Sequence, residues 1–153
     1  MRVSWGFDAH RLGGAPPVLL AGVMVDSARG VVATSDGDLV AHAVADAVLG
    51  AAGLGDLGTH FPSSDPQWAG ADSMDLLRSV VSMCSDIEVS FVDVTVIAQD
   101  VRVAPHREAI RESLATALRI DVGQVSVKAT TTDGMGALGA GEGIAATAVV
   151  TAS

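Results

Sequence analysis

The chain is poor in the residues that build disulfide frameworks and aromatic cores. Cys84 is the only cysteine among 153 residues, and tyrosine is absent. An intramolecular disulfide is therefore impossible, and zinc motifs built from several cysteines are excluded. Aromatic residues make up 3% of the chain although 49% of it is apolar, so the interior must be packed mainly from alanine, valine, leucine and isoleucine. We interpret Cys84 as a structural residue on a buried helix face.

Basic residues are also few. The 9 Lys and Arg residues are outnumbered by 18 Asp and Glu residues, which leaves a net charge of −9. Such acidity argues against nucleic acid or an anionic membrane as a partner. It does not exclude a phosphorylated substrate, because a bound metal supplies positive charge locally. No apolar run approaches the roughly 18 residues of a membrane helix, and no signal sequence opens the chain, so we expect a cytoplasmic protein.

The length and the hydrophobic pattern indicate one domain, residues 1–153. Runs of β-branched residues predict strands at 3–10, 18–25, 89–98, 124–132 and 143–151. Apolar residues at helical spacing predict helices at 39–52, 73–85 and 106–118. Strands interleaved with helices are typical of an α/β (α+β) fold, here a mixed sheet with about three helices over one face.

The predicted last strand, residues 143–151, has almost no polar residue, so both of its faces must be covered. One layer of three helices protects only one face of a sheet. We therefore expect the other face to pack against another molecule, most simply another copy of the chain.

A carboxylate and two imidazoles form the candidate metal site. Asp8 and His10 lie two residues apart on a predicted strand, so both side chains point to the same face. His42 lies in the first turns of the predicted helix 39–52. This ligand set is typical of a catalytic zinc ion, which has three protein ligands and one open position. Asp38 and Asp46, one helical turn on either side of His42, are candidates to accept its second ring N–H.

Several short motifs follow one another in a fixed order from residue 6 to residue 143. They are GFDAH (6–10), SDGD (35–38), LGDLG (54–58), FP (61–62), GADS (70–73), IAQ (97–99), KATTTD (128–133) and GEG (141–143). In this order they resemble the 2-C-methyl-D-erythritol 2,4-cyclodiphosphate synthase family, an enzyme family of the non-mevalonate isoprenoid pathway. The resemblance covers essentially the whole chain.

The resemblance implies a reaction, two metals and a homotrimer. Family members convert 4-diphosphocytidyl-2-C-methyl-D-erythritol 2-phosphate into the cyclic diphosphate and CMP, as phosphorus–oxygen lyases. By resemblance Asp8, His10 and His42 hold Zn²⁺, and Asp133 holds Mg²⁺ or Mn²⁺ together with the substrate. The family usually has Glu at this last position, so Asp133 is one methylene shorter. The three sheets of the trimer turn inward, with active sites between neighbouring subunits.

The remaining site residues are also implied by the resemblance. Thr131 is placed to stabilise the pentavalent phosphorus, and Thr34 stands at a second catalytic position, where the family normally has His. Substrate contacts fall to three groups of residues. They are Ser35, Asp56, Leu57, Gly58, Phe61, Ser63 and Asp65 for the phosphates and erythritol hydroxyls; Ala98, Arg102, Val103 and Ala104 for cytosine; and Thr130 and Thr132 as hydroxyl donors.

Two other functions stay open at this point. The departures at Thr34, Ser63 and Asp133 are compatible with a catalytically silent trimer that binds cytidine nucleotides. The three metal-ligand residues alone are compatible with a zinc-dependent hydrolase, which would need a general base near the metal. Turnover of the cytidine substrate to CMP separates these functions.

Overall fold

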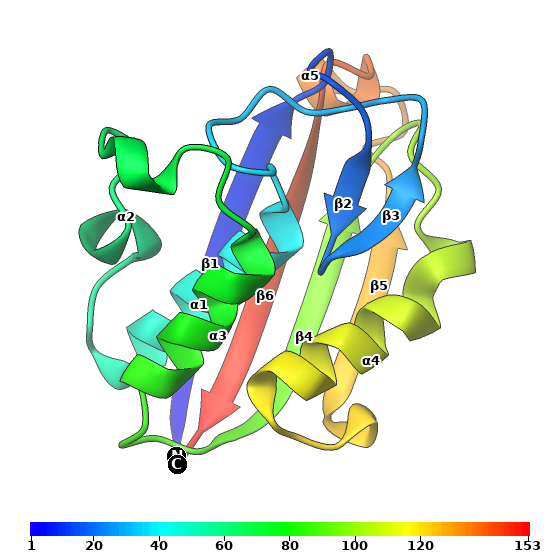
Figure 1. Cartoon of the computed structure of the whole chain (residues 1–153). Helices are drawn as coiled ribbons and strands as arrows, with labels where there is room; N and C mark the ends of the chain where they lie inside the picture. Colours follow the sequence, from blue (N-terminus) through cyan, green and yellow to red (C-terminus); the bar gives the residue numbers. More distant parts are fainter.

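A computed structural model describes all 153 residues, and a four-stranded mixed sheet forms its centre (Figure 1). The strand order is β1-β6-β4-β5. The strands are β1 (Arg2–Arg11), β4 (Val89–Ile97), β5 (Val125–Thr130) and β6 (Gly143–Ala152). β6 is antiparallel to both β1 and β4, whereas β4 and β5 are parallel. The carboxyl ends of β1, β4 and β5 therefore lie at the same end of the sheet.

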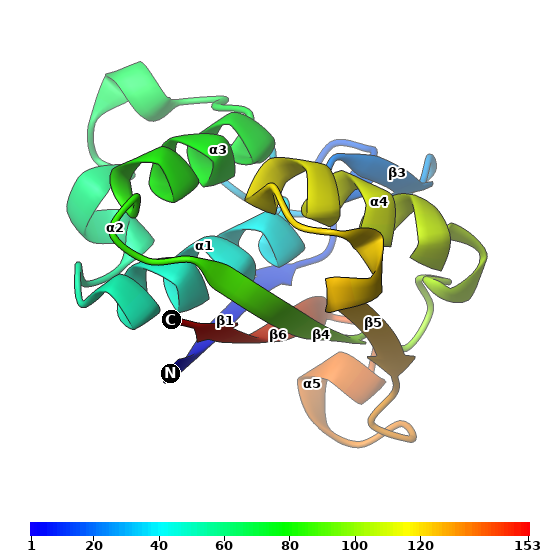
Figure 2. The same cartoon turned by 90° about the horizontal axis from the view of Figure 1, so that it is seen from below.

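Three helices form a single layer on one face of this sheet, as Figure 2 shows from below. They are α1 (Leu39–Ala52), α3 (Ser73–Met83) and α4 (Arg107–Leu118). The predicted fold class is confirmed, and each of the three predicted helices forms to within two residues of its expected ends. α1 is packed between β1 and α3, so ten of its 14 residues are buried. Its sequence is accordingly apolar nearly all round. It begins after the N-cap Asp38 and ends at Gly53, whose φ of 75° suits a left-handed C-cap.

The predicted strand at 18–25 is wrong as a single strand. It is a hairpin of β2 (Val18–Leu20) and β3 (Val23–Asp26), connected by Ala21 and Gly22. Both connecting residues have positive φ, 50° and 74°, as a two-residue hairpin turn requires. The carboxylate of Asp38 holds this turn, because it accepts the N–H groups of Ala21 at 2.8 Å and Gly22 at 2.6 Å.

Several short elements were not predicted from the sequence. They are α2 (Leu57–His60), α5 (Gly136–Gly139) and three 3₁₀ turns at Pro66–Trp68, Ala104–His106 and Val122–Gln124. Elements of three or four residues are too short to show a hydrophobic period. α5 lies on the side of the sheet that the three long helices leave open (Figure 2). No helix combines the length and the hydropathy that a membrane crossing requires.

The face of the sheet opposite the helices exposes apolar side chains, and we call it the open face. Val3, Trp5 and Phe7 of β1 are 64%, 62% and 47% exposed there, and Phe91 and Val149 continue the surface on β4 and β6. The rings of Trp5 and Phe7 are stacked, with centroids 5.9 Å apart. The chain's own residues thus do not cover the open face. This is the face that the sequence predicts to pack against another copy of the chain.

Candidate metal centre and adjoining pocket

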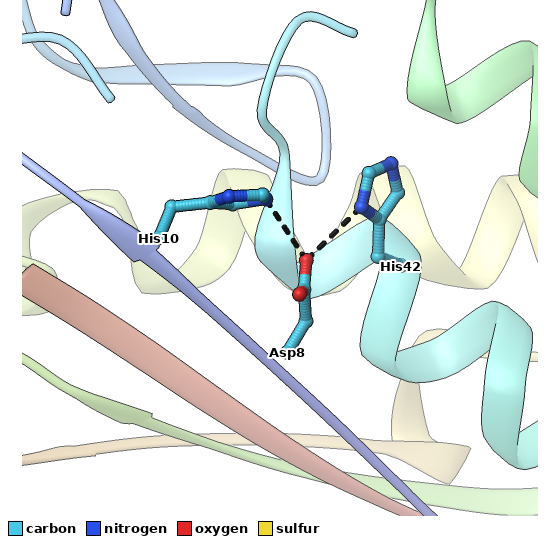
Figure 3. A group of neighbouring side chains, drawn as sticks. All are labelled: Asp8, His10 and His42. Atoms are coloured by element: carbon cyan, nitrogen blue, oxygen red, sulfur yellow. Dashed lines mark hydrogen bonds and ion pairs between the residues drawn. The ribbon is translucent and has the colours of Figure 1, made fainter. Parts of the chain in front are cut away.

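β1 and α1 bring Asp8, His10 and His42 together (Figure 3). Gly6 makes this approach possible, since a Cβ at position 6 would lie 2.0 Å from the carbonyl oxygen of Ala43 in α1. With no side chain at Gly6, the first turns of α1 lie directly over β1. His42 then faces the two even-numbered β1 residues that point to the helix layer.

The donor atoms of this Asp8–His10–His42 group converge on one point. Asp8 Oδ2 lies 3.0 Å from His42 Nδ1 and 3.1 Å from His10 Nε2. One ligand atom from each residue lies within 4.8 Å of the other two. His10 Nε2 is buried, and apart from its contact with Asp8 it has no partner, so it is available as a nitrogen ligand. One carboxylate oxygen and two ring nitrogens in this arrangement can hold a metal ion.

The three side chains also change one another's ionisation. Burial opposes ionisation of the Asp8 carboxyl, but the neighbouring His10 and His42 outweigh it and hold the pKa of Asp8 well below its usual value. Burial likewise opposes the charged form of His42, but the Asp8 carboxylate outweighs it and raises the pKa of His42. The group therefore favours an anion at Asp8 and a positive charge beside it, whether that charge is a proton or a metal.

The predicted partners of the second ring nitrogen of His42 are wrong. Asp38 is fully buried and is used by the hairpin turn and by the N–H of Ala41 at 3.0 Å. Asp46 accepts the N–H of Leu57 at 2.7 Å. His42 Nε2 instead lies 2.8 Å from the hydroxyl of Ser73, the first residue of α3.

A pocket of about 180 Å³ adjoins His42 and collects many of the predicted substrate residues. It is lined by Thr34, Ser35, His42, Leu57, Gly58, Phe61, Ser63, Trp68 and Leu76. Trp68 was not predicted for the site; its ring meets that of Phe61 edge-on, with centroids 4.9 Å apart. A larger hollow, about 580 Å³, is lined chiefly by residues 81–89 and 118–124 and contains none of the predicted site residues. The smaller pocket is therefore the one associated with the candidate metal centre.

Three predicted polar residues around this pocket also stabilise its backbone. Asp56 caps α2 through the N–H and hydroxyl of Thr59, both at 2.8 Å, and these bonds lower the pKa of Asp56. Asp65 caps the 3₁₀ turn that carries Trp68. Ser35 does not cap α1; its hydroxyl accepts the N–H of Gly37 at 3.2 Å. The anion-favouring start of α1 is thus already occupied by Asp38.

The predicted cytosine loop and threonine segment meet at the carboxyl ends of β4 and β5. Ala98 N donates to Thr130 O at 3.0 Å, and Gly134 N donates to the side-chain oxygen of Gln99 at 3.3 Å. Asp133 is exposed, and its N–H donates to the Thr131 hydroxyl at 3.1 Å. Arg102 and Ala104 are exposed in the same loop, whereas Val103 is buried. Thr131 and Asp133 are therefore adjacent, as the sequence predicts.

This second group of residues lies on the opposite edge of the sheet from the candidate metal centre. Asp8 pairs with Ala146, which pairs with Val96, which in turn pairs with Ala129. Three strand spacings separate Asp8 from Ala129, or about 14 Å. One chain therefore does not bring the Asp8–His10–His42 group into contact with Thr131 and Asp133.

A mixed α/β domain that presents a carboxylate and two imidazoles beside a pocket is consistent with a metal-dependent enzyme. Over residues 1–153 the chain matches the model of the YgbB family, and it belongs to that family. It is 50% identical over 152 residues to the 2-C-methyl-D-erythritol 2,4-cyclodiphosphate synthase of Shewanella halifaxensis, covering 98% of this chain and 96% of the relative. The enzyme of that name from Idiomarina loihiensis is 49% identical over the same shares.

Solved structures share the fold. IspF of Plasmodium falciparum in complex with CDP is 30% identical, with a TM-score of 0.85 over 99% of this chain and 94% of that chain. The bifunctional IspDF of Campylobacter jejuni is 38% identical, with a TM-score of 0.94 over 97% of this chain and 41% of that longer protein. The predicted family is thus confirmed.

Proposed function

We propose that this chain is a metal-dependent 2-C-methyl-D-erythritol 2,4-cyclodiphosphate synthase. It converts 4-diphosphocytidyl-2-C-methyl-D-erythritol 2-phosphate into 2-C-methyl-D-erythritol 2,4-cyclodiphosphate and CMP, as a phosphorus–oxygen lyase of the non-mevalonate isoprenoid pathway in the cytoplasm. The observation that carries the proposal is the Asp8–His10–His42 group beside the His42 pocket, in a chain half identical to synthases of that name.

The reaction needs no side-chain nucleophile. An oxygen of the substrate's 2-phosphate attacks the β-phosphorus, a new P–O bond closes the ring, and the bond to the CMP oxygen breaks. Because attacking and leaving groups are both anionic, the protein must align them and offset their charge. Ser73, His42 and Asp8 do lie in hydrogen-bonded succession in the candidate site, but the Ser73 hydroxyl is buried and donates to Asp36, so it is not free to act as a nucleophile.

The chain's residues then divide into two tasks. Asp8, His10 and His42 would hold Zn²⁺, and Asp133 would hold Mg²⁺ or Mn²⁺ with the substrate diphosphate. When bound, these ions would act as Lewis acids that offset the charge of the phosphate oxygens. The exposed Thr131 hydroxyl donates to Asp133 Oδ1 at 3.3 Å, and it would turn to donate to the phosphorus oxygens as they gain charge. The pocket residues Leu57, Gly58, Phe61 and Ser63 would enclose the erythritol part, with Asp56 and Asp65 at its rim.

The active unit would be a homotrimer of single-domain chains. The open face exposes Val3, Trp5 and Phe7, and apolar surface of this extent indicates an association surface. The distance of about 14 Å between the two halves of the site supports the same conclusion, because a neighbouring subunit can supply the second half. Arg102, Val103, Ala104 and Ala98 would then bind cytosine beside the zinc site of the adjacent chain.

Three departures from the family pattern favour a second function, a catalytically silent trimer that binds cytidine nucleotides. Thr34 lines the His42 pocket where an imidazole is usual, Ser63 lines it where the family commonly has Asp, and Asp133 is shorter than the usual Glu. Thr34 and Ser63 place shorter side chains in the pocket without closing it, and Asp133 retracts its carboxylate by one methylene.

Release of CMP decides between these functions. The purified chain, loaded with Zn²⁺ and supplied with Mg²⁺, is incubated with the cytidine substrate, and CMP and the cyclic diphosphate are quantified by chromatography. We expect equal amounts of both products, lost on chelation. CDP binding without CMP release would support the silent trimer, and CMP with a linear product would indicate a hydrolase.

A further inference from the structure

His42 is connected through Ser73 to the carboxylate of Asp36. His42 Nε2 lies 2.8 Å from Ser73 Oγ, and Ser73 Oγ is hydrogen-bonded to Asp36 Oδ1. We propose that Ser73, held by Asp36, is a positioning residue that fixes the tautomer and ring orientation of His42 for metal binding. The inference rests on the proposed metal site and extends it to two residues outside the ligand set.

The direction of each hydrogen bond follows from the chemistry of the groups. An ionised carboxylate offers only acceptors, so the Ser73 hydroxyl donates its single proton to Asp36. Its oxygen is then left to accept, and the only donor toward it is the N–H on His42 Nε2. A neutral imidazole that carries its proton on Nε2 has its lone pair on Nδ1. Nδ1 is the atom that faces Asp8, so the metal-binding tautomer is the one selected.

Ser73 has little freedom to leave this arrangement. Ser73 is only 1% exposed, and its backbone N–H donates to the other oxygen of Asp36 at 2.9 Å. The two segments are also tied in the reverse direction, since Asp36 N donates to Ala71 O at 3.2 Å. Three hydrogen bonds, one of them from the Ser73 hydroxyl, therefore join the start of α3 to the loop before α1. Water cannot readily replace a partner held in this way.

If Ser73 only held the start of α3 to the loop before α1, its substitution would have different effects. Changing Ser73 would then lower the stability of the metal-free protein without altering the metal affinity of the molecules that remain folded. A positioning residue changes the affinity itself, because a ring free to adopt the other tautomer offers N–H instead of a lone pair. Partners that orient a ligating histidine are typically worth about 10- to 100-fold in metal affinity.

The test compares Ser73→Ala with Ser79→Ala. Ser79 lies on the same helix, and its hydroxyl bonds to Asp75 O away from the metal group, so it is a matched control. Zn²⁺ affinity is measured by competition with a chromogenic chelator, and Co²⁺ absorption spectra report the ligand geometry. We expect Ser73→Ala to bind Zn²⁺ about 10- to 100-fold more weakly with an altered Co²⁺ spectrum. Ser79→Ala should match the wild type in both, and Ser73→Thr, which keeps the hydroxyl, should recover most of the affinity.

An affinity of Ser73→Ala within about twofold of the wild type, with an unchanged Co²⁺ spectrum, would overturn the inference. If Ser73→Ala does not fold, as judged by circular dichroism, Asp36→Asn is titrated in its place, with the same two outcomes. Asparagine can present an N–H to the hydroxyl and so reverse the direction of the chain of bonds. Because the titration uses the metal alone, its result stands whether or not the chain releases CMP.

Discussion

Gly6 of β1 lies against the carbonyl of Ala43 in α1. A Cβ at position 6 would be 2.0 Å from Ala43 O and 2.9 Å from Ala47 N, both backbone atoms of the helix. Backbone atoms cannot rotate out of the way as a side chain can, so the whole helix would have to move. Since His42 precedes Ala43, the spacing between strand and helix also sets the spacing within the metal group.

Gly6→Ala should therefore damage both the fold and the metal site. We expect the free energy of unfolding to fall by about 3 kcal/mol, the upper end of the usual cost of overpacking. Urea denaturation of the metal-free protein measures it, and zinc content after dialysis should fall as well. Gly123→Ala is the control, because a Cβ there meets no atom within 4 Å. Equal stability of the two variants would mean that α1 adjusts without cost.

His42→Ala should remove most of the bound zinc. Two remaining ligands, Asp8 and His10, rarely retain the ion, and activity should be almost abolished. Metal analysis of the purified protein by mass spectrometry measures it. His60→Ala is the control, since His60 Nε2 bonds to Leu54 O at 2.8 Å and lies outside the group. One zinc per chain in His42→Ala would sink the ligand assignment.

The metal-free protein should show a pH-dependent stability that comes from Asp8 and His42. The pKa of Asp8 is lowered, so its contribution is present above its usual value of 3.8 and lost as the pH falls through the lowered value. The pKa of His42 is raised, so its contribution is present below its usual value of 6.5 and lost as the pH rises through the raised value. This pair should therefore contribute most between these two usual values.

Urea denaturation in the presence of a chelator, from about pH 4 to about pH 9, measures this contribution. The matched variant is Asp8→Asn, which removes the charge that raises the pKa of His42. The difference in unfolding free energy between the wild type and Asp8→Asn should shrink as the pH rises above 6.5. A difference that stays constant to alkaline pH would contradict the ion pair.

Much of the fold could be predicted because its elements are long and carry a clear hydrophobic pattern. α3 and α4 show the helical period, whereas α1 and β6 are nearly continuous apolar runs. The β2–β3 hairpin was missed because Ala21 occupies a positive-φ position where Asn, Asp or Gly is the usual signal. Without that signal, residues 18–25 look like one apolar run.

The candidate site was predictable only where its contacts are local or follow a family motif. Asp8 and His10 share a face because they are two residues apart on a strand. The partner of His42 is 31 residues away in a different helix, and a Ser after an Asp at a helix start indicates only a cap. Asp38 and Asp46 have the right helical spacing to His42, but backbone N–H groups of the hairpin and of α2 bind them instead.

Asp133→Asn should abolish activity and leave stability and zinc content almost unchanged. Asp133 is exposed with a φ of 53°, a conformation that Asn adopts as readily as Asp. The change therefore removes only the charge that would hold Mg²⁺ with the diphosphate. Magnesium-dependent CMP release measures it, and Asp133→Glu, which restores the family's usual side chain, should remain active. Normal turnover of Asp133→Asn in magnesium would show that the carboxylate has another role.

Hybrid trimers should recover activity from two inactive variants. His42→Ala lacks the zinc half of the site and Thr131→Ala lacks the phosphate half, and the sheet register separates these halves by about 14 Å within one chain. If each active site combines one half from each of two neighbouring subunits, every trimer that contains both variants has about one intact site in three. Co-expression with two different tags, followed by double purification, isolates trimers that contain both variants, and CMP release is then measured.

Trimers that carry both substitutions in every chain are the control and should be inactive. Hybrid trimers as inactive as this control would place both halves of the site within a single chain.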